Sequence, residues 1–161
     1  MKRFVLPLIA LALLSQGAAG QSTIFLVRHA EKAQATADEK DPELSEAGRS
    51  RAESLAQMLK DAGIIAIYVT EFKRTQQTAQ SLARAIGVKE TIVPAKDTAV
   101  LISKLKETKG HALVIGHSNT LSEIVGALGS SLPITIAEAD YDNLFVMTLT
   151  TPPRLLSLHY R

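Results

Sequence analysis

Two arginines and two histidines in this chain follow short apolar runs, at positions from which their side chains could bind phosphate. Arg28 and His29 directly follow the run TIFLV, Arg74 lies a few residues after AIYV, and His117 follows ALVI and one glycine. Guanidinium groups bind phosphoryl oxygens in bidentate fashion. A neutral imidazole can act as a nucleophile. The four residues therefore predict a phosphoryl-transfer site, provided that folding gathers them.

The apolar runs are typical of β-strands, and segments with helical spacing alternate with them. Ligands of open α/β sheets bind outside the carboxyl ends of the strands, where these four residues would lie. The pattern predicts one α/β domain, a three-layer sandwich with a mainly parallel central sheet flanked by helices and a final antiparallel strand pair at an edge. We expect strands near 23–27, 65–69, 90–93, 112–115, 144–150 and 155–160, and helices near 45–62, 75–86, 97–108 and 119–128.

Arg74 and its neighbour Lys73 lie at the predicted start of a helix. Cations are unfavourable there, because the N-terminus of a helix carries a partial positive charge. Their presence makes sense if an anion is shared between the guanidinium and the helix N-terminus. His117 also lies at a strand–helix junction, directly after a glycine. The histidines without such a setting, His111 and His159, are predicted to be structural.

Residues 1–20 have the pattern of a secretory signal peptide. Two basic residues come first, an apolar stretch follows over residues 4–14, and small residues precede the expected cleavage after Ala19 or Gly20. The apolar stretch is shorter than the ~20 residues that a membrane-spanning helix needs. We therefore expect a mature domain over residues 21–161, in the periplasm or outside the cell and free of the membrane.

Composition excludes several classes of function. The full chain has 18 Lys and Arg against 16 Asp and Glu, so loss of Lys2 and Arg3 with the leader balances the charge. No basic stripe remains to bind nucleic acid. Aromatic residues make up only 4% of the chain, which argues against a stacking platform for bases or sugars. The chain has no cysteine, which excludes a disulfide, a thiol nucleophile and a cysteine–zinc site.

Four segments resemble the motifs of the histidine phosphatase superfamily, which has the phosphoglycerate-mutase-like fold. They resemble, in the family's order, its Arg-His-Gly, Leu-Thr-x-x-Gly, Ser-x-x-x-Arg-Thr-x-x-Thr-Ala and Gly-His motifs. The segments are 26–31 (LVRHAE), 44–48 (LSEAG), 70–79 (TEFKRTQQTA) and 116–119 (GHSN). Together they span nearly the whole expected mature chain, which the resemblance identifies as a histidine phosphatase-like catalytic domain. Ala30 stands where the first motif has its usual glycine.

The resemblance implies that His29 is a nucleophile that becomes phosphohistidine, with no metal or other cofactor. Arg28, Arg74 and His117 would complete the phosphate pocket. Nearby cations oppose protonation of an imidazole, so we expect His29 to be neutral before phosphate binds. Bound phosphate acts in the opposite direction and favours a protonated, donating His117.

The proton donor for the leaving group remains open. The acid-phosphatase branch of the family uses a His-Asp pair, but here Ser118 follows His117. Glu71 is our preferred candidate, because it follows the second strand at the expected site edge. Asp97 and Glu31 are alternatives.

The sequence predicts an exported phosphatase that hydrolyses a small phosphate ester or phosphohistidine without a metal. The loops 31–43 and 130–143 must shape its specificity. Neither contains a basic cluster, so polyphosphorylated substrates are not expected. Mutase activity is less favoured, since no phosphorylated donor is expected outside the cytoplasm. The alternative is a non-catalytic phosphate- or phosphoprotein-binding module on the same fold.

Overall fold

The structure is a computed structural model that describes residues 22–35 and 39–160. The expected signal peptide, residues 1–20, lies outside the described residues. Within the described ranges, no helix combines the length and the apolar character that crossing a membrane requires.

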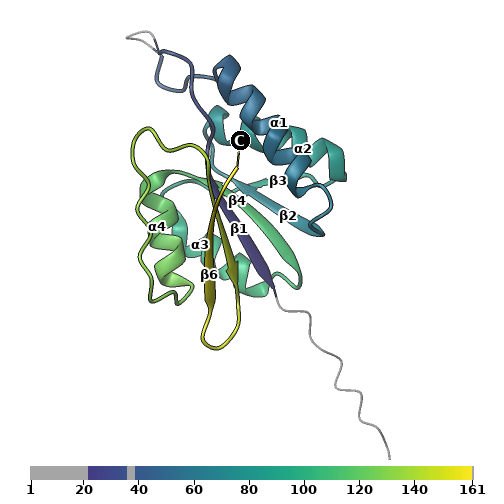
Figure 1. The fold of residues 1–161 in the computed structure, drawn as a ribbon, viewed down its shortest axis with the longest axis vertical. Helices are drawn as coiled ribbons and strands as arrows, with labels where there is room; N and C mark the ends of the chain where they lie inside the picture. Colours follow the sequence, from purple (N-terminus) through teal and green to yellow (C-terminus); the bar gives the residue numbers. More distant parts are fainter. Residues whose placement is uncertain (1–21, 36–38, 161) are drawn as a thin grey trace, which may run out of the picture.

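The described residues form a mixed sheet with the strand order β3-β2-β4-β1-β5-β6 (Figure 1). The first four strands of that order run parallel to one another, whereas β5 and β6 are antiparallel to their neighbours. This confirms the predicted mainly parallel sheet with an antiparallel pair at its edge. The strands are β1 (Thr23–Arg28), β2 (Ile64–Val69), β3 (Glu90–Ile92), β4 (His111–Gly116), β5 (Asn143–Thr148) and β6 (Arg154–His159).

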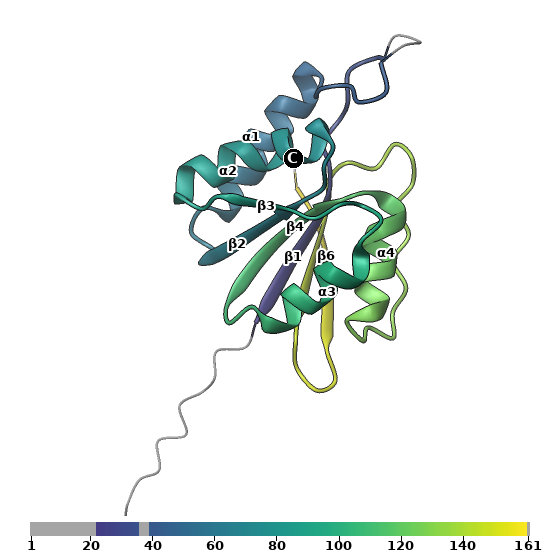
Figure 2. The ribbon, with the colours of Figure 1, turned by 180° about the vertical axis from the view of Figure 1, so that it is seen from behind.

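Helices cover both faces of this sheet and complete the predicted three-layer sandwich (Figures 1 and 2). One face carries α1 (Glu46–Leu59) and α2 (Lys73–Ile86), and the other carries α3 (Thr98–Glu107) and α4 (Ser118–Ala127). Each helix was expected within two or three residues of these bounds. The apolar spacing of the helices predicted them because only one stripe of each helix is buried.

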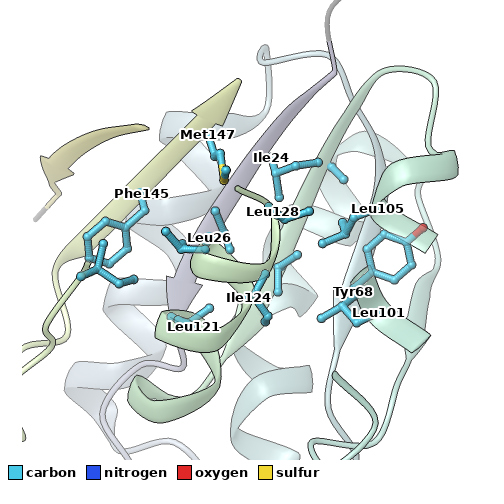
Figure 3. Close-up of a cluster of buried hydrophobic side chains, with 14 of the residues drawn as sticks. Ile24, Leu26, Tyr68, Leu101, Leu105, Leu121, Ile124, Leu128, Phe145 and Met147 are labelled. Carbon is cyan, nitrogen blue, oxygen red and sulfur yellow. The ribbon is translucent and has the colours of Figure 1, made fainter. Parts of the chain in front are cut away.

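The buried side chains divide into two main clusters, one on each side of the sheet. Successive residues of a strand point to opposite faces, so β1 serves both clusters. Its Ile24 and Leu26 pack with Leu121 and Ile124 of α4 (Figure 3), whereas Val27 packs on the side of α1 and α2. A central strand buried on both faces explains why its sequence is apolar without alternation.

Two helix starts show how far the local sequence determines a helix boundary. Ser45 caps α1, because its hydroxyl accepts a hydrogen bond from the amide of Gly48 at 3.1 Å. Phe72, the residue before α2, gives no side-chain cap. The amide of Lys73 instead donates to both carboxylate oxygens of Asp41, at 3.2 and 3.1 Å. This contact spans 32 residues, so the pattern around α2 could not reveal it.

Candidate active site

The parallel pairing of β1 and β4 brings the two candidate histidines together. Arg28 and Gly116 end these strands and face each other in register. Beyond them, the amide of His29 donates to the carbonyl oxygen of Gly116 at 3.0 Å. The imidazole centroids of His29 and His117 lie 5.4 Å apart. The expected convergence of these residues at the carboxyl edge of the sheet is therefore present in the structure.

His29 is held in one tautomer by its neighbour. Its side chain is buried, at 5% exposure, and Nδ1 lies 2.8 Å from the carbonyl oxygen of Ala30. A carbonyl only accepts, so Nδ1 carries the proton and donates. The amide of Ala30 in turn donates to Oγ1 of Thr78 at 3.0 Å, which fixes this turn of the backbone. Nε2 of the neutral ring keeps its lone pair, as a nucleophile requires.

Burial is the main cause that keeps His29 neutral. The pKa of His29 is lowered from 6.5 to about 4, with burial as the largest cause, and the hydrogen bond to Ala30 opposes part of that shift. The charges of Arg74, His117 and Arg28 make smaller contributions to the lowered pKa, in that order. The direction is the expected one, but its main cause is desolvation, and the cations contribute less.

His117 is half-buried and is anchored at the start of α4. Its Nε2 lies 3.1 Å from Oγ1 of Thr70, and its amide donates to Oγ1 of Thr120 at 3.0 Å. The ring of Phe72 meets it edge-on at a centroid distance of 5.4 Å. Burial, followed by the charge of Arg74, lowers the pKa of His117 from 6.5 to about 4. Both imidazoles are therefore neutral at neutral pH, and a phosphate dianion would favour protonation of His117.

Arg28 links the site to the loop that precedes β5. Its Nη1 donates to the carbonyl oxygens of Ala137, Glu138 and Asp140 at 3.0, 2.9 and 3.4 Å. Its guanidinium carbon lies 4.4 Å from the ring centre of Tyr141, at cation–π distance. Among the described residues, Nε of Arg28 is buried without a hydrogen-bond partner. A donor that is desolvated in this way is suited to an anion.

Arg74 lies in the first turn of α2, where its position predicted a shared anion. Its guanidinium carbon lies 4.2 Å from the ring centre of Phe72. Its Nη1 lies 3.5 Å from Oδ1 of Asp41, the same carboxylate that accepts from the amide of Lys73. An anion is shared between the guanidinium and the helix N-terminus, as predicted, but it is the protein's own carboxylate.

The preferred proton donor, Glu71, lies beside the pocket. It is exposed, and its Oε2 accepts a hydrogen bond from the amide of Ala95 at 2.8 Å. Its charge raises the pKa of His117 against the larger effects of burial and Arg74, which places Glu71 within electrostatic range. Glu71 can reach a leaving group only if its side chain turns from Ala95 towards the pocket.

The two alternative acids differ in their surroundings. Arg51 binds Glu31 through Nε and Nη2, with a shortest distance of 2.7 Å. Burial alone would raise the pKa of Glu31, but the hydrogen bonds and charge of Arg51 lower it. A carboxylate held in this way is a poor acid. Asp97 is the N-cap residue of α3 and is half-buried.

The predicted structural histidines lie apart from this chemistry. His111 begins β4, at the opposite end of that strand from His117, and meets the ring of Phe25 edge-on at 6.4 Å. His159 ends β6 and pairs with Asp142 at 3.2 Å. Within the described part of the chain, no group of three or more His, Cys, Asp or Glu side chains is arranged to hold a metal ion.

Sequence reasoning missed the residues that support this pocket. Thr78 accepts from the amide of Ala30 and donates to the carbonyl oxygen of Arg74 at 2.7 Å, so it connects the turn after His29 with α2. Thr70 and Thr78 lie in the matched segment 70–79 and could have been found there. Tyr141 and Asp41 lie in loops, where no local pattern marks them.

Comparison with known proteins agrees with this arrangement. Residues 24–96 match the family model of the histidine phosphatase superfamily (branch 1), a range that includes Arg28, His29 and Arg74. Over these residues the chain is similar to the histidine phosphatase superfamily. No curated protein matches the chain by sequence.

Solved structures support this similarity through the fold. A protein assigned as the phosphohistidine phosphatase SixA of Agrobacterium tumefaciens is 25% identical, with a TM-score of 0.66 over 84% of this chain and 97% of that one. The protein histidine phosphatase SixA in complex with tungstate is 19% identical, with a TM-score of 0.68 over 85% and 96%. A mycobacterial glucosyl-3-phosphoglycerate phosphatase is 14% identical, with a TM-score of 0.62 over 87% and 98%. At these identities, the last two show the fold alone.

Proposed function

We propose that this protein is a histidine phosphatase that hydrolyses phosphomonoesters or phosphohistidine through a covalent phosphohistidine on His29. The observation that carries the proposal is the hydrogen bond from Nδ1 of His29 to Ala30, which leaves Nε2 unprotonated beside a second imidazole and two guanidinium groups. The phosphatase relatives support the reaction class.

The reaction would proceed in two displacements at phosphorus. Nε2 of His29 attacks, the N–P bond forms, and the bond from phosphorus to the leaving oxygen or nitrogen breaks. The leaving group takes its electron pair and a proton from the acid, for which Glu71 is the candidate. Water then attacks the phosphohistidine and returns a proton to that carboxylate, which releases inorganic phosphate and restores the neutral ring. Each displacement spreads negative charge over the equatorial oxygens, so Arg28, Arg74 and a protonated His117 stabilise both transition states.

The position of the proposed acid, Glu71, favours substrates with a good leaving group. Glu71, the proposed acid, is exposed and bonded to a backbone amide rather than directed at the histidines. An imidazole or a phenolate needs less help from an acid than an alkoxide does. Phosphohistidine is therefore a substrate class that this site suits, and one relative is named as a phosphohistidine phosphatase.

The test is turnover of a chromogenic aryl phosphate in the presence of EDTA. The native protein should be active, and His29→Ala should lose at least about 1000-fold in kcat, because the nucleophile is removed. His111→Ala is the matched control and should keep its activity. Intact mass after rapid quenching should show one added phosphoryl group on the native chain and none on His29→Ala. An inactive native protein would reject the catalytic proposal.

The alternative function is a phosphate- or phosphoprotein-binding module. The hydrogen bond that holds the Glu71 carboxylate on the amide of Ala95 favours it, since binding needs the arginines but no acid. It predicts that the native protein binds inorganic phosphate in calorimetry, does not turn over aryl phosphate, and loses binding in Arg74→Ala.

We also propose that the protein is exported and that residues 1–20 are its signal peptide. The support is the order of basic, apolar and small residues in that segment. Fractionation of bacterial cells that express the full chain should place the protein outside the cytoplasm, with a new N-terminus at Gly20 or Gln21. A version without residues 2–20 should stay inside. An uncleaved full chain in the cytoplasm would reject this proposal.

A further inference from the structure

Asp41 is an acidic residue at the edge of the phosphate pocket that the mechanism above does not use. Its carboxylate accepts two hydrogen bonds from the amide of Lys73, at 3.2 and 3.1 Å, and lies 3.5 Å from Nη1 of Arg74. Its negative charge lies beside Arg74, where the negatively charged phosphoryl group of a substrate must also bind. Such a residue either orients the arginine or competes with the substrate for it.

The distances favour competition over orientation. Charge-assisted pairs that fix an arginine are typically about 2.7–2.9 Å long, and often bidentate. The pair of Arg51 with Glu31 in this chain has that form, with a shortest distance of 2.7 Å. The single contact of Arg74 with Asp41 is 3.5 Å long, at the outer limit of a hydrogen bond. Asp41 is therefore held mainly by the start of α2, and its effect on Arg74 is chiefly that of its charge.

A neutral group is in place to orient Arg74. The ring of Phe72 lies 4.2 Å from the guanidinium carbon, which supports the planar group without adding charge. Arg28 is also oriented by neutral groups. Its Nη1 donates to three carbonyl oxygens, and the Tyr141 ring lies against its guanidinium group. Asp41 is the charged exception among these contacts.

We propose that Asp41 weakens the affinity of the pocket for phosphate by competing with the phosphoryl group for Arg74. The proposal rests on the phosphate pocket of the proposed function. A carboxylate and a phosphoryl group that share one guanidinium repel each other, so part of the attraction of Arg74 is cancelled. The consequence for turnover is an easier release of inorganic phosphate, the product that binds the same arginine.

The test compares two neutralised acids from the same loop. Asp41→Asn removes the charge and keeps an oxygen that can accept from the amide of Lys73. Glu43→Gln removes the same charge two residues further on, from an exposed side chain. The Kd of inorganic phosphate is measured by calorimetry on each protein, and its Ki is measured against an aryl phosphate. Circular dichroism and thermal melting verify that each variant is folded.

We expect Asp41→Asn to bind inorganic phosphate about tenfold more tightly, and Glu43→Gln to match the native chain within about twofold. Weaker or unchanged binding in Asp41→Asn would overturn the proposal, because it would show that Asp41 orients Arg74 or has no effect. If Asp41→Asn does not fold, Asp41→Ser provides the same comparison with a smaller neutral acceptor. Absence of phosphate binding in all these proteins would overturn the pocket itself, and with it the proposed function.

Discussion

At the scale of single residues, the pocket depends on two imidazoles that are neutral before phosphate arrives. Burial lowers the pKa of both His29 and His117 from 6.5 to about 4. The hydrogen bond from His29 to Ala30 then decides which ring nitrogen can attack. A nucleophile that requires no deprotonation step would work well below neutral pH.

The titration of these rings is directly measurable. Proton–carbon NMR spectra of the native protein without phosphate should show His29 and His117 titrating near pH 4, because burial disfavours the charged form. Addition of inorganic phosphate should raise the midpoint of His117, because the anion stabilises the imidazolium. A midpoint above pH 6 for His29 without phosphate would contradict the burial argument.

The assignment of the acid is a second prediction at this scale. Glu71→Gln should slow alkyl phosphates about 10- to 100-fold more than aryl phosphates, because only the alkoxide needs protonation. The measurement is kcat for a matched pair of alkyl and aryl substrates. Asp97→Asn, the remaining alternative, is the comparison variant. Equal effects of Glu71→Gln on both substrates would remove Glu71 from the role.

The sequence predicted the residues that carry chemistry better than the residues that support them. Arg28, His29 and His117 were predictable because each is the last residue of a strand or directly follows one, so the strand alone determines its position. Asp41 and Tyr141 were not predictable. Their contacts with Arg74 and Arg28 join segments that only the folded chain brings together.

At the scale of elements, the fit of α1 against the chain after β1 is the tightest contact near the site. Gly48 is buried in the first turn of α1, and a Cβ at that position would overlap the carbonyl oxygen of Glu31. The amide of Ser45 donates to the same oxygen at 2.9 Å, so the backbone cannot easily retreat. The glycine of the second matched motif is therefore needed for packing.

This contact predicts a large effect of one methyl group. Gly48→Ala should lower the free energy of unfolding by about 2 kcal/mol or more, since it forces two backbone segments apart. Gly126→Ala is the matched control, because nothing lies within 4 Å of a Cβ at that helical position. It should raise stability by about 0.5–1 kcal/mol. Urea denaturation measures both, and equal effects would contradict the packing argument.

Helix and strand positions were predictable to within a few residues because their apolar spacing reflects burial on one or two faces. The start of α2 was less predictable than that of α1. Ser45 directly precedes the helix that it caps, whereas the group that caps α2 is Asp41, which lies in a loop distant in the sequence.

At the scale of the whole molecule, the same histidines couple stability to pH. In the unfolded chain they bind protons near pH 6.5, whereas in the folded protein they do so near pH 4. Between these values the unfolded state binds more protons, so their contribution to stability is complete above about pH 6.5 and is lost as the pH falls towards 4.

Urea denaturation at about pH 7 and about pH 4.5 should therefore show a loss of stability at the lower pH. The double variant His29→Gln, His117→Gln should lose less over the same interval, because it lacks the two buried imidazoles. The comparison separates their contribution from that of the carboxylates, which both proteins share. An identical loss in the two proteins would show that the histidines do not titrate differently on unfolding.

The three-layer architecture and its antiparallel edge followed from the alternation of elements along the chain. The strand order did not, because neighbours such as β1 and β4 are separated by more than 80 residues, and no local pattern records which strands pair.

The hydrogen bonds from Arg28 to the loop before β5 have a consequence for how the sequences of related proteins can diverge. Backbone carbonyl oxygens of Ala137, Glu138 and Asp140 hold the guanidinium, while the side chains of Ala137 and Glu138 are exposed. Any residue supplies a carbonyl, so the identities of these two exposed residues can drift without loosening Arg28. Substitutions at these two positions could therefore change substrate preference while the contacts of Arg28 stay the same.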